Sequence, residues 1–216
     1  MNIKAFTVNP FGVNAFVLSN SAKEAILIDP SFLSEVERTE IGNYIQSNGL
    51  KVCRALNTHL HLDHILGNTF VEKKFGTKVE AHKDDEFLLA FQEQQSAMYG
   101  LSIREPAGPL GNYLNEGDIV RIGSESDTIE LRVIHIPGHS PGGLAFFFEG
   151  DKNQGPILFS GDILFNGGMG RTDLFGGNEE ALVSGIKNKL FTLPPETIVY
   201  PGHGPKTTIG TEKEWF

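Results

Sequence analysis

Short apolar stretches separated by turn residues follow one another along the whole chain, and their lengths and spacings predict both strands and helices. The N-terminal part predicts three short strands, over residues 2–8, 13–18 and 25–28. The last of them is continuously apolar, which predicts a strand that is buried on both faces.

A helix is predicted after these strands. Ser34 and Glu37 have the spacing of a capping box, in which each side chain accepts a hydrogen bond from the backbone of the other residue. Apolar residues then recur at helical spacing until Asn48-Gly49 ends the run, namely Val36, Ile41, Tyr44 and Ile45. The start and stop signals therefore agree.

The rest of the chain continues to alternate between the two patterns. Strands are predicted over residues 51–57, 78–81, 119–122, 129–136, 143–148, 157–160 and 197–200, and helices over 64–75, 83–98 and 178–190. In the helix over 83–98, Phe87, Leu88 and Phe91 share one face, which we expect to lie in the core. The order of elements predicts an α/β fold, with two packed sheets and helices outside them.

Composition supports one globular domain over residues 1–216, because 39% of the residues are apolar and 21% are charged. No apolar stretch approaches the roughly 20 residues that cross a bilayer, and the first residues do not resemble a secretion signal. Cys53 is the only cysteine, so no intrachain disulfide can form. We therefore expect a cytoplasmic protein with no membrane partner.

The charge balance argues against nucleic acid as a partner. The formal net charge is −9, with 27 acidic and 18 basic residues and no basic cluster. A protein that holds a phosphate backbone needs the opposite balance on the contacting face. The partner we expect is a small molecule, and the sequence does not predict an oligomeric state.

Candidate metal-ligating residues are concentrated in one segment between a predicted strand and a predicted helix, Thr58-His59-Leu60-His61-Leu62-Asp63-His64. Alternate side chains of an extended segment share a face, so His59, His61 and Asp63 can point the same way. A turn into the helix can bring His64 beside them. The segment therefore predicts four converging metal ligands.

Three later motifs place a ligand-type residue in a loop after a strand, next to glycine or proline. They are Pro137-Gly138-His139-Ser140-Pro141-Gly142, Ser160-Gly161-Asp162 and Pro201-Gly202-His203-Gly204-Pro205. Each alone could be structural, but together with the first segment they provide nitrogen and oxygen ligands and no sulfur. That set predicts two divalent ions. His82 and His135 lack this setting and are expected to be structural.

In this order, these motifs resemble those of the metallo-β-lactamase-fold hydrolases. The stretches Gly161 to Phe165, Gly168 to Leu174 and Gly204 to Gly210 resemble the short glyoxalase II-like branch of that superfamily, which is similar to hydroxyacylglutathione hydrolases. The resemblance covers the whole chain. It implies an αβ/βα four-layer sandwich with the site at one edge of the two sheets.

The resemblance also implies a ligand set. One metal would lie on His59, His61 and His139, a second on Asp63, His64 and His203, and Asp162 would bridge the two. The ions implied are zinc, with iron or manganese as alternatives. Asp29 resembles a position that supports the site without binding metal, although it can equally be a turn residue that leads into a helix.

Two such ions lower the pKa of a shared water to about 7, so a bridging hydroxide is the predicted nucleophile, with Asp63 or Asp162 orienting it. A thiolate, with a conjugate pKa of about 8.5, leaves without a dedicated acid, which favours a thioester substrate. Hydroxyacylglutathione thioesters are implied by the resemblance. The C-terminal helical domain with which full-length glyoxalase II enzymes hold glutathione has no counterpart before the last residue, Phe216.

Several alternatives stay open at this point. Arg171, in a glycine-rich loop, can bind an anionic part of the substrate or can pair with Asp173 to hold the loop. A mononuclear iron persulfide dioxygenase would use His59, His139 and Asp162. The same metal chemistry would also act on a lactone, another acyl substrate or a β-lactam. A non-enzymatic alternative is a fold that binds metal only for structural stability, or that serves as an interaction surface.

Overall fold

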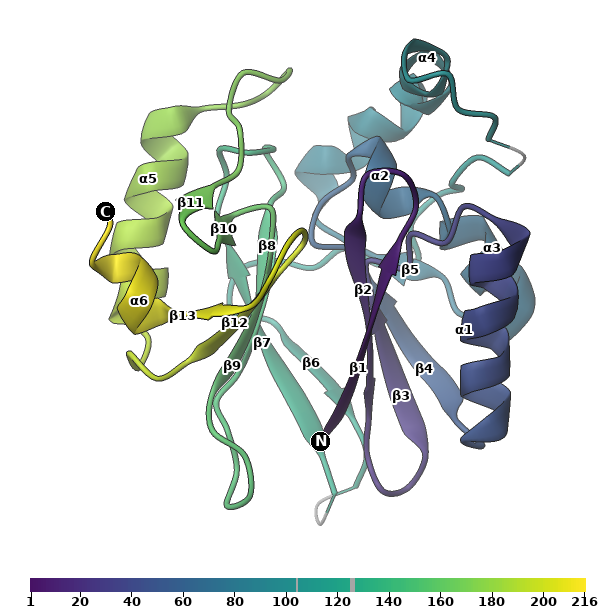
Figure 1. Ribbon diagram of the computed structural model, residues 1–216, viewed down its shortest axis with the longest axis horizontal. Coiled ribbons are helices and arrows are strands. Elements are labelled where there is room, and N and C mark those ends of the chain that lie inside the picture. The colour runs from purple at the N-terminus through teal and green to yellow at the C-terminus, as the bar shows by residue number, and fades with distance from the viewer. Residues whose placement is uncertain (104, 125–126) are drawn as a thin grey trace.

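Two β-sheets face each other, with helices on their outer faces, in the computed structural model, which describes residues 1–103, 105–124 and 127–216 (Figure 1). The first sheet has the order β1-β2-β3-β4-β5, formed by Asn2–Val8, Val13–Ser19, Glu24–Ile28, Lys51–Leu56 and Val79–Glu80. The predicted α/β sandwich is confirmed.

The second sheet has the order β13-β12-β9-β8-β7-β6. In chain order its strands are β6 (Ile119–Ile122), β7 (Ile129–His135), β8 (Leu144–Phe148), β9 (Ile157–Gly161), β12 (Ile198–Pro201) and β13 (Thr207–Thr208). A separate hairpin of β10 (Leu164–Phe165) and β11 (Gly168–Met169) follows β9. Strands β7, β9 and β12 run in one direction, because β12 is parallel to β9 and β8 is antiparallel to both β7 and β9.

The helices lie outside the sheets. Helices α1 (Glu35–Ser47) and α3 (Asn68–Phe75) cover the first sheet, and α5 (Glu179–Asn188) and α6 (Ile209–Lys213) lie beside the second (Figure 1). The remaining helical segments are α2 (Leu62–Ile65), the 3₁₀ helices η1 (Lys83–Phe91) and η2 (Leu190–Thr192), and α4 (Gln92–Met98). Ser34 and Glu37 form the predicted capping box of α1.

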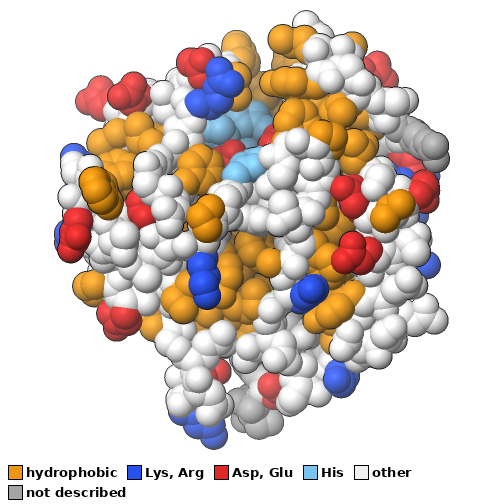
Figure 2. Space-filling model, in the orientation of Figure 1, with side chains coloured by type: hydrophobic (Ala, Val, Ile, Leu, Met, Phe, Trp, Pro, Cys, Tyr) orange, Lys and Arg blue, Asp and Glu red, His pale blue; other side chains and the backbone are white. Residues whose placement is uncertain are grey.

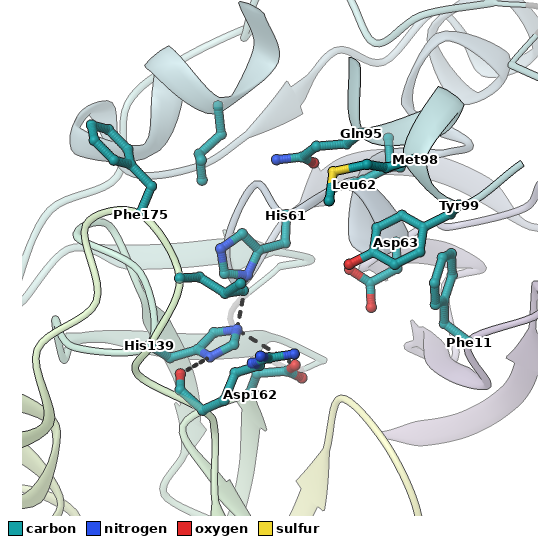
Figure 3. A pocket seen from close by; sticks show the side chains of 13 residues that line it. Phe11, His61, Leu62, Asp63, Gln95, Met98, Tyr99, His139, Asp162 and Phe175 are labelled. Carbon is teal, nitrogen blue, oxygen red and sulfur yellow. Dashed lines mark hydrogen bonds and ion pairs between the residues drawn. The ribbon is translucent and has the colours of Figure 1, made fainter. Parts of the chain in front are cut away.

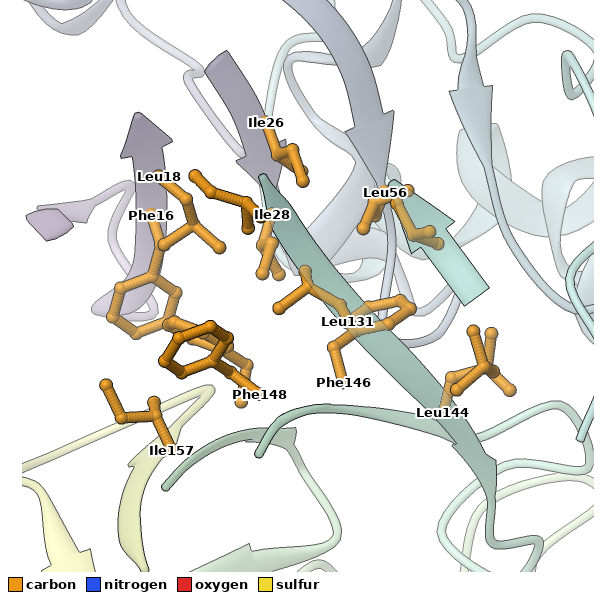
Figure 4. Packing of buried hydrophobic residues seen from close by; sticks show 14 of the residues in the cluster. Phe16, Leu18, Ile26, Ile28, Leu56, Leu131, Leu144, Phe146, Phe148 and Ile157 are labelled. Carbon is orange, nitrogen blue, oxygen red and sulfur yellow. The ribbon is translucent and has the colours of Figure 1, made fainter. Parts of the chain in front are cut away.

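Strand β2 shows how the sequence builds three packed layers. Its side chains alternate, so Phe16 and Leu18 enter the core between the two sheets, whereas Ala15 and Val17 enter the core between the first sheet and its helices. Figure 4 shows the core between the sheets, where Phe16 and Leu18 lie close to side chains of the second sheet. The side chains of β2 therefore contribute to two separate cores, one on each face of the first sheet.

Two helical predictions are corrected by tertiary contacts. The helix expected over 64–75 begins earlier, at Leu62, and is divided into α2 and α3 at Gly67. A β-carbon on Gly67 would lie 2.7 Å from the backbone nitrogen of Phe32, so the chain passes too close to its neighbour there for any larger residue.

The helix expected over 83–98 is a 3₁₀ helix followed by α4, and only part of its apolar stripe is core. Leu88 is buried, Phe87 is half-buried, and Phe91 is 41% exposed. The short elements β10, β11, β13 and α6 are additional to the predicted set. Within the described ranges, no helix has both the length and the apolar character needed to span a bilayer.

Candidate metal centre

Four loops that follow strands meet at one edge of the two sheets. The loop after β4 carries His59 and His61, and those after β7, β9 and β12 carry His139, Asp162 and His203. Parallel strands bring their carboxyl ends to the same edge, so residues far apart in the chain become neighbours. Figure 2 shows histidine side chains inside a hollow at this edge.

The first loop differs from the prediction in one respect. Residues 58–61 lie outside any helix, and His61 is the N-cap residue of α2. Asp63 and His64 therefore project from the first turn of a helix, and Asp63 does not share an extended face with His59. Both side chains still reach the site.

His59, His61 and His139 form a first cluster of buried rings. His61 Nδ1 lies 2.9 Å from His139 Nε2, although 78 residues separate the two, and His139 Nε2 lies 3.2 Å from His59 Nε2. One nitrogen of each ring lies within 4.8 Å of the others. Three nitrogens at this spacing can surround one cation.

Asp63, His64 and His203 form a second cluster of the same size. His64 Nε2 lies 3.3 Å from His203 Nε2, and His203 Nε2 lies 3.2 Å from Asp63 Oδ2. His64 is fully buried, whereas the side chain of His203 is 27% exposed. This cluster can offer a cation two nitrogens and one carboxylate.

Asp162 lies between the two clusters. Its Oδ2 is 3.6 Å from Nε2 of His139 in the first cluster and 3.6 Å from Nε2 of His203 in the second. Its Oδ1 is 3.4 Å from His64 Nε2. One carboxylate therefore contacts both groups, as a bridging ligand would.

Acceptors hold the outer nitrogens of three rings, those of His59, His139 and His203. Nδ1 of His139 donates to the carbonyl of Arg171 at 2.7 Å, and Nδ1 of His203 donates to the carbonyl of Phe11 at 3.1 Å. Because a carbonyl only accepts, these nitrogens carry the protons and Nε2 carries the lone pair of the neutral ring. This pattern orients ligating histidines in metal sites.

The neighbours of Nδ1 can be described in the same way for His59 and His64. Thr58 Oγ1 donates to Asp29 Oδ2 at 2.7 Å, so it accepts from His59 Nδ1 at 3.1 Å. His64 Nδ1 lies 3.1 Å from Asp29 Oδ2. The lone pair of His59 therefore also points inward, whereas Nδ1 of His64 forms no hydrogen bond with a residue in the described part of the chain.

These residues fit a pair of divalent cations. Nε2 of His59 and Nε2 of His139 both carry lone pairs and face each other at 3.2 Å, an arrangement that a hydrogen bond between the two neutral rings cannot satisfy. Asp162 Oδ1 is buried and forms no hydrogen bond with any residue in the described part of the chain. Cations between these atoms would satisfy both the facing lone pairs and the carboxylate.

Burial and neighbouring charges shift the pKa values of two histidines in each cluster, downward in the first cluster and upward in the second. Burial, with its neighbour His64, lowers the pKa of His59, and burial together with His139 lowers that of His61 to about 4. Burial alone would lower the pKa of His64 and His203, but nearby carboxylates raise both above the ordinary value.

The two carboxylates show the complementary effect. Burial alone would raise the pKa values of Asp63 and Asp162, but His64 lowers both below the ordinary value. Both carboxylates are therefore ionised at neutral pH, as ligands of a cation must be.

Asp29 lies directly beneath the site and does not cap the following helix, whose N-cap is Ser34. Its carboxylate is buried, accepts from the backbone nitrogen of Thr58 at 2.7 Å, and faces His64. Its φ of 46° directs the chain sharply after β3. Asp29 thus connects the strand end to a ring in each cluster.

Asp85 is a supporting residue that the sequence did not reveal. This fully buried carboxylate accepts hydrogen bonds from the backbone nitrogen of Leu60 at 3.2 Å, from Ser140 Oγ at 2.8 Å and from the backbone nitrogen of Gly142 at 2.5 Å. It therefore connects the loop of His59 and His61 to the loop of His139. In the sequence it is one of three adjacent acids at a predicted helix start, where acids are ordinary.

The other predicted residues lie around or outside the clusters. Arg171 lines the cavity above them, and its guanidinium forms two hydrogen bonds with Asp173, at 2.6 and 2.7 Å. His82 and His135 stack on each other with ring centroids 4.0 Å apart, and neither belongs to a metal-ligating cluster among the described residues.

Comparison with known proteins identifies the family to which this chain is related. The model of the metallo-β-lactamase superfamily matches residues 8–203. Hydroxyacylglutathione hydrolase GloC of Haemophilus influenzae is 34% identical over 99% of this chain and 95% of its own length.

Two solved structures agree over nearly the whole chain. The B3 metallo-β-lactamase BLEG-1 is 34% identical with a TM-score of 0.85, and covers 99% of this chain and 97% of its own. TTHA1623 in a di-iron-bound form is 34% identical with a TM-score of 0.79, and covers 97% of this chain and 96% of its own. The chain therefore belongs to the metallo-β-lactamase superfamily.

Proposed function

We propose that this metallo-hydrolase cleaves acyl thioesters with water, and that hydroxyacylglutathione-type thioesters are the first class to test. The observation that carries the proposal is the orientation of the rings. Acceptors hold the outer nitrogens of His59, His139 and His203, so the lone pairs of these rings face the two clusters, with Asp162 between them.

The two clusters would hold one ion each. His59, His61 and His139 would bind the first ion and Asp63, His64 and His203 the second, with Asp162 shared. Two divalent ions, with zinc as the first candidate and iron or manganese as alternatives, would lower the pKa of a shared water and polarise a carbonyl.

The two carboxylates then orient the water. Asp63 and Asp162 are ionised at neutral pH, so their oxygens accept a hydrogen bond from the water and direct its lone pair toward the substrate carbonyl. Loss of one water proton to bulk solvent would leave a hydroxide, whose attack would form the bond from carbon to oxygen and move the carbonyl π pair onto the carbonyl oxygen. Return of that pair would break the bond from carbon to sulfur. The thiolate leaves with the electron pair.

A thioester suits the composition of the site. The titratable groups on the floor of the cavity are His61, Asp63, His139 and Asp162, all candidate metal ligands. An amine leaving group would need a separate proton donor, whereas a thiol with a pKa of about 8.5 leaves as the thiolate. The similarity to GloC supports the same substrate class.

Arg171 is the candidate for binding an anionic part of such a substrate. Its ion pair with Asp173 is exposed on both sides, so exchanging Asp173 for a substrate carboxylate would cost little. Arg171→Ala should raise KM for charged thioesters and leave kcat nearly unchanged.

Thioester hydrolysis by zinc-loaded protein, followed by release of free thiol, tests the proposal. S-lactoylglutathione should be hydrolysed, and the rate should fall at least 100-fold after chelation or in Asp162→Ala. Turnover that survives in Asp162→Ala would refute the shared-ligand role.

Other chemistries are tested on the same sample. Oxygen uptake with glutathione persulfide by the iron-loaded protein, without thioester hydrolysis, would favour a persulfide dioxygenase. The similarity to BLEG-1 makes a β-lactam the second substrate to test, with a lactone as the third. Cleavage of either of these without thioester hydrolysis would replace the proposed substrate class.

A further inference from the structure

Large apolar side chains that are exposed to solvent gather at the mouth of the cavity above the two clusters. Met98 is 78% exposed, Tyr99 55% and Phe175 77%, and all three line this cavity, which has a volume of about 510 Å³. We call these three residues the apolar rim. Surface apolar residues are usually scattered, so their concentration around one opening indicates a binding surface.

The rim has two opposing walls. Met98 ends α4 and Tyr99 follows it, and the ring of Tyr99 packs edge to face against Phe11, with centroids 5.2 Å apart. Phe175 belongs to the loop that follows β11. Figure 3 shows Met98, Tyr99 and Phe11 on one side of the cavity and Phe175 on the other, with His139 and Asp162 below.

The wall that carries Phe175 is supported from behind. Its ring packs against Phe87, with centroids 5.5 Å apart, and against Phe91 at 6.5 Å. Phe91, which the sequence placed in the core, is thus an apolar neighbour of the rim and is 41% exposed. The two walls therefore form a cleft that is apolar above a polar floor.

Charge on the cavity lining favours an uncharged occupant. Among the described lining residues, Arg171 is the single cation, and its guanidinium is already paired with Asp173. The remaining charged lining residues, Asp63 and Asp162, lie at the floor. A substrate group that lies between the rim walls therefore contacts apolar surface, and Arg171 remains the one cationic side chain of the described lining that an anionic part elsewhere in the substrate could reach.

We propose that the substrate carries an unbranched alkyl or an aromatic acyl group, which lies between Met98 and Tyr99 on one side and Phe175 on the other. This inference rests on the proposed function, because it places the acyl carbonyl over the metal-ligating floor. Within the thioesters, it ranks those with an apolar acyl group above the hydroxyacyl thioesters with which testing begins.

Binding of thioethers that cannot be hydrolysed tests the inference without requiring turnover. The probes are the S-methyl, S-butyl and S-hexyl ethers of N-acetylcysteamine, titrated into zinc-loaded protein by calorimetry. Affinity should rise about two- to threefold per methylene as apolar surface is buried. Equal affinity for all three ethers would overturn the inference.

Variants then locate the binding surface. The double variant Met98→Ser, Phe175→Ser should abolish the dependence on chain length, and both sites are mostly exposed, so the fold should tolerate the change. Val36→Ser is the matched control, because Val36 on α1 is 77% exposed and does not line this cavity. A chain-length dependence that survives in the double variant would contradict the assignment.

A parallel hydrolysis series separates the two proposals. Acetyl, butyryl, hexanoyl and lactoyl thioesters of N-acetylcysteamine should show kcat/KM rising with the apolar chain. If the ethers bind more tightly as the chain lengthens but no thioester is hydrolysed, the proposed function is refuted and the role of the apolar rim in binding is retained. If kcat/KM does not depend on the acyl chain and the ethers bind equally, the role of the apolar rim is refuted and the proposed function is retained.

Discussion

Ser140 Oγ donates a 2.8 Å hydrogen bond to the buried carboxylate of Asp85, which lies 55 residues earlier in the chain. The same carboxylate accepts from the backbone nitrogen of Leu60, so a single side chain fixes the distance between two ligand loops. Burial raises the pKa of Asp85, opposed by these hydrogen bonds. The ligands of the first cluster thus depend on a residue that would bind no metal.

Asp85→Asn should weaken the first metal site. The amide group keeps the shape of the side chain, but its NH₂ would face at least one of the three groups that donate to Asp85, which are Leu60 N, Ser140 Oγ and Gly142 N. Two donors would then face each other, and one buried N–H would lose its hydrogen-bond partner. We expect a loss of about 2 kcal/mol in unfolding free energy and a 10- to 100-fold lower affinity for the first metal. Chemical denaturation and metal titration measure both. Asp84→Asn, at the exposed neighbour, is the control, and wild-type metal affinity in Asp85→Asn would contradict the role.

Gly202 leaves room that the second cluster needs. A β-carbon there would overlap with Asp162 Oδ1 and lie 2.9 Å from His64 Cε1. Gly202→Ala should therefore displace both side chains, lower stability by about 1–3 kcal/mol and reduce metal content. Gly168→Ala is the matched control, because its β-carbon would meet no described atom within 4 Å. Equal metal content in the two variants would show that this close packing is unimportant.

Acid should release the second metal before the first. A metal displaces protons from its ligands, so a ligand with a raised pKa loses the competition at a higher pH. The pKa values of His64 and His203 are raised, whereas that of His61 is lowered to about 4 and that of His59 is also lowered. As pH falls toward 6.5, His64 and His203 therefore become protonated, while His59 and His61 stay neutral.

Variants that keep one cluster each allow this order to be measured. His203→Ala should retain the metal of the first cluster and His61→Ala that of the second. Metal content after equilibration between pH 8 and pH 5 should fall at a higher pH in His61→Ala than in His203→Ala. Coincident or reversed release curves would be inconsistent with the pKa shifts.

The site was more predictable from the sequence than its surroundings were. The segment from Thr58 to His64 could be predicted as a metal site because its candidate ligands are close together in the chain. Glycine and proline beside His139 and His203 marked the loops that carry these two residues. Helix boundaries were less predictable, since Gly67, where α2 and α3 separate, lies close to the backbone of Phe32, a contact that no local sequence pattern reveals. Asp85 carries no local signal, because its partners come from two distant loops. Phe91 has the spacing of a core residue, and only the fold shows that its neighbour is Phe175.

Anomalous scattering from crystals of the zinc-loaded protein tests the central claim most directly. The account predicts two zinc peaks, one within bonding distance of His59, His61 and His139 and the other within bonding distance of Asp63, His64 and His203, with Asp162 touching both. A single peak away from these residues, or fully loaded protein with no peak between them, would contradict it.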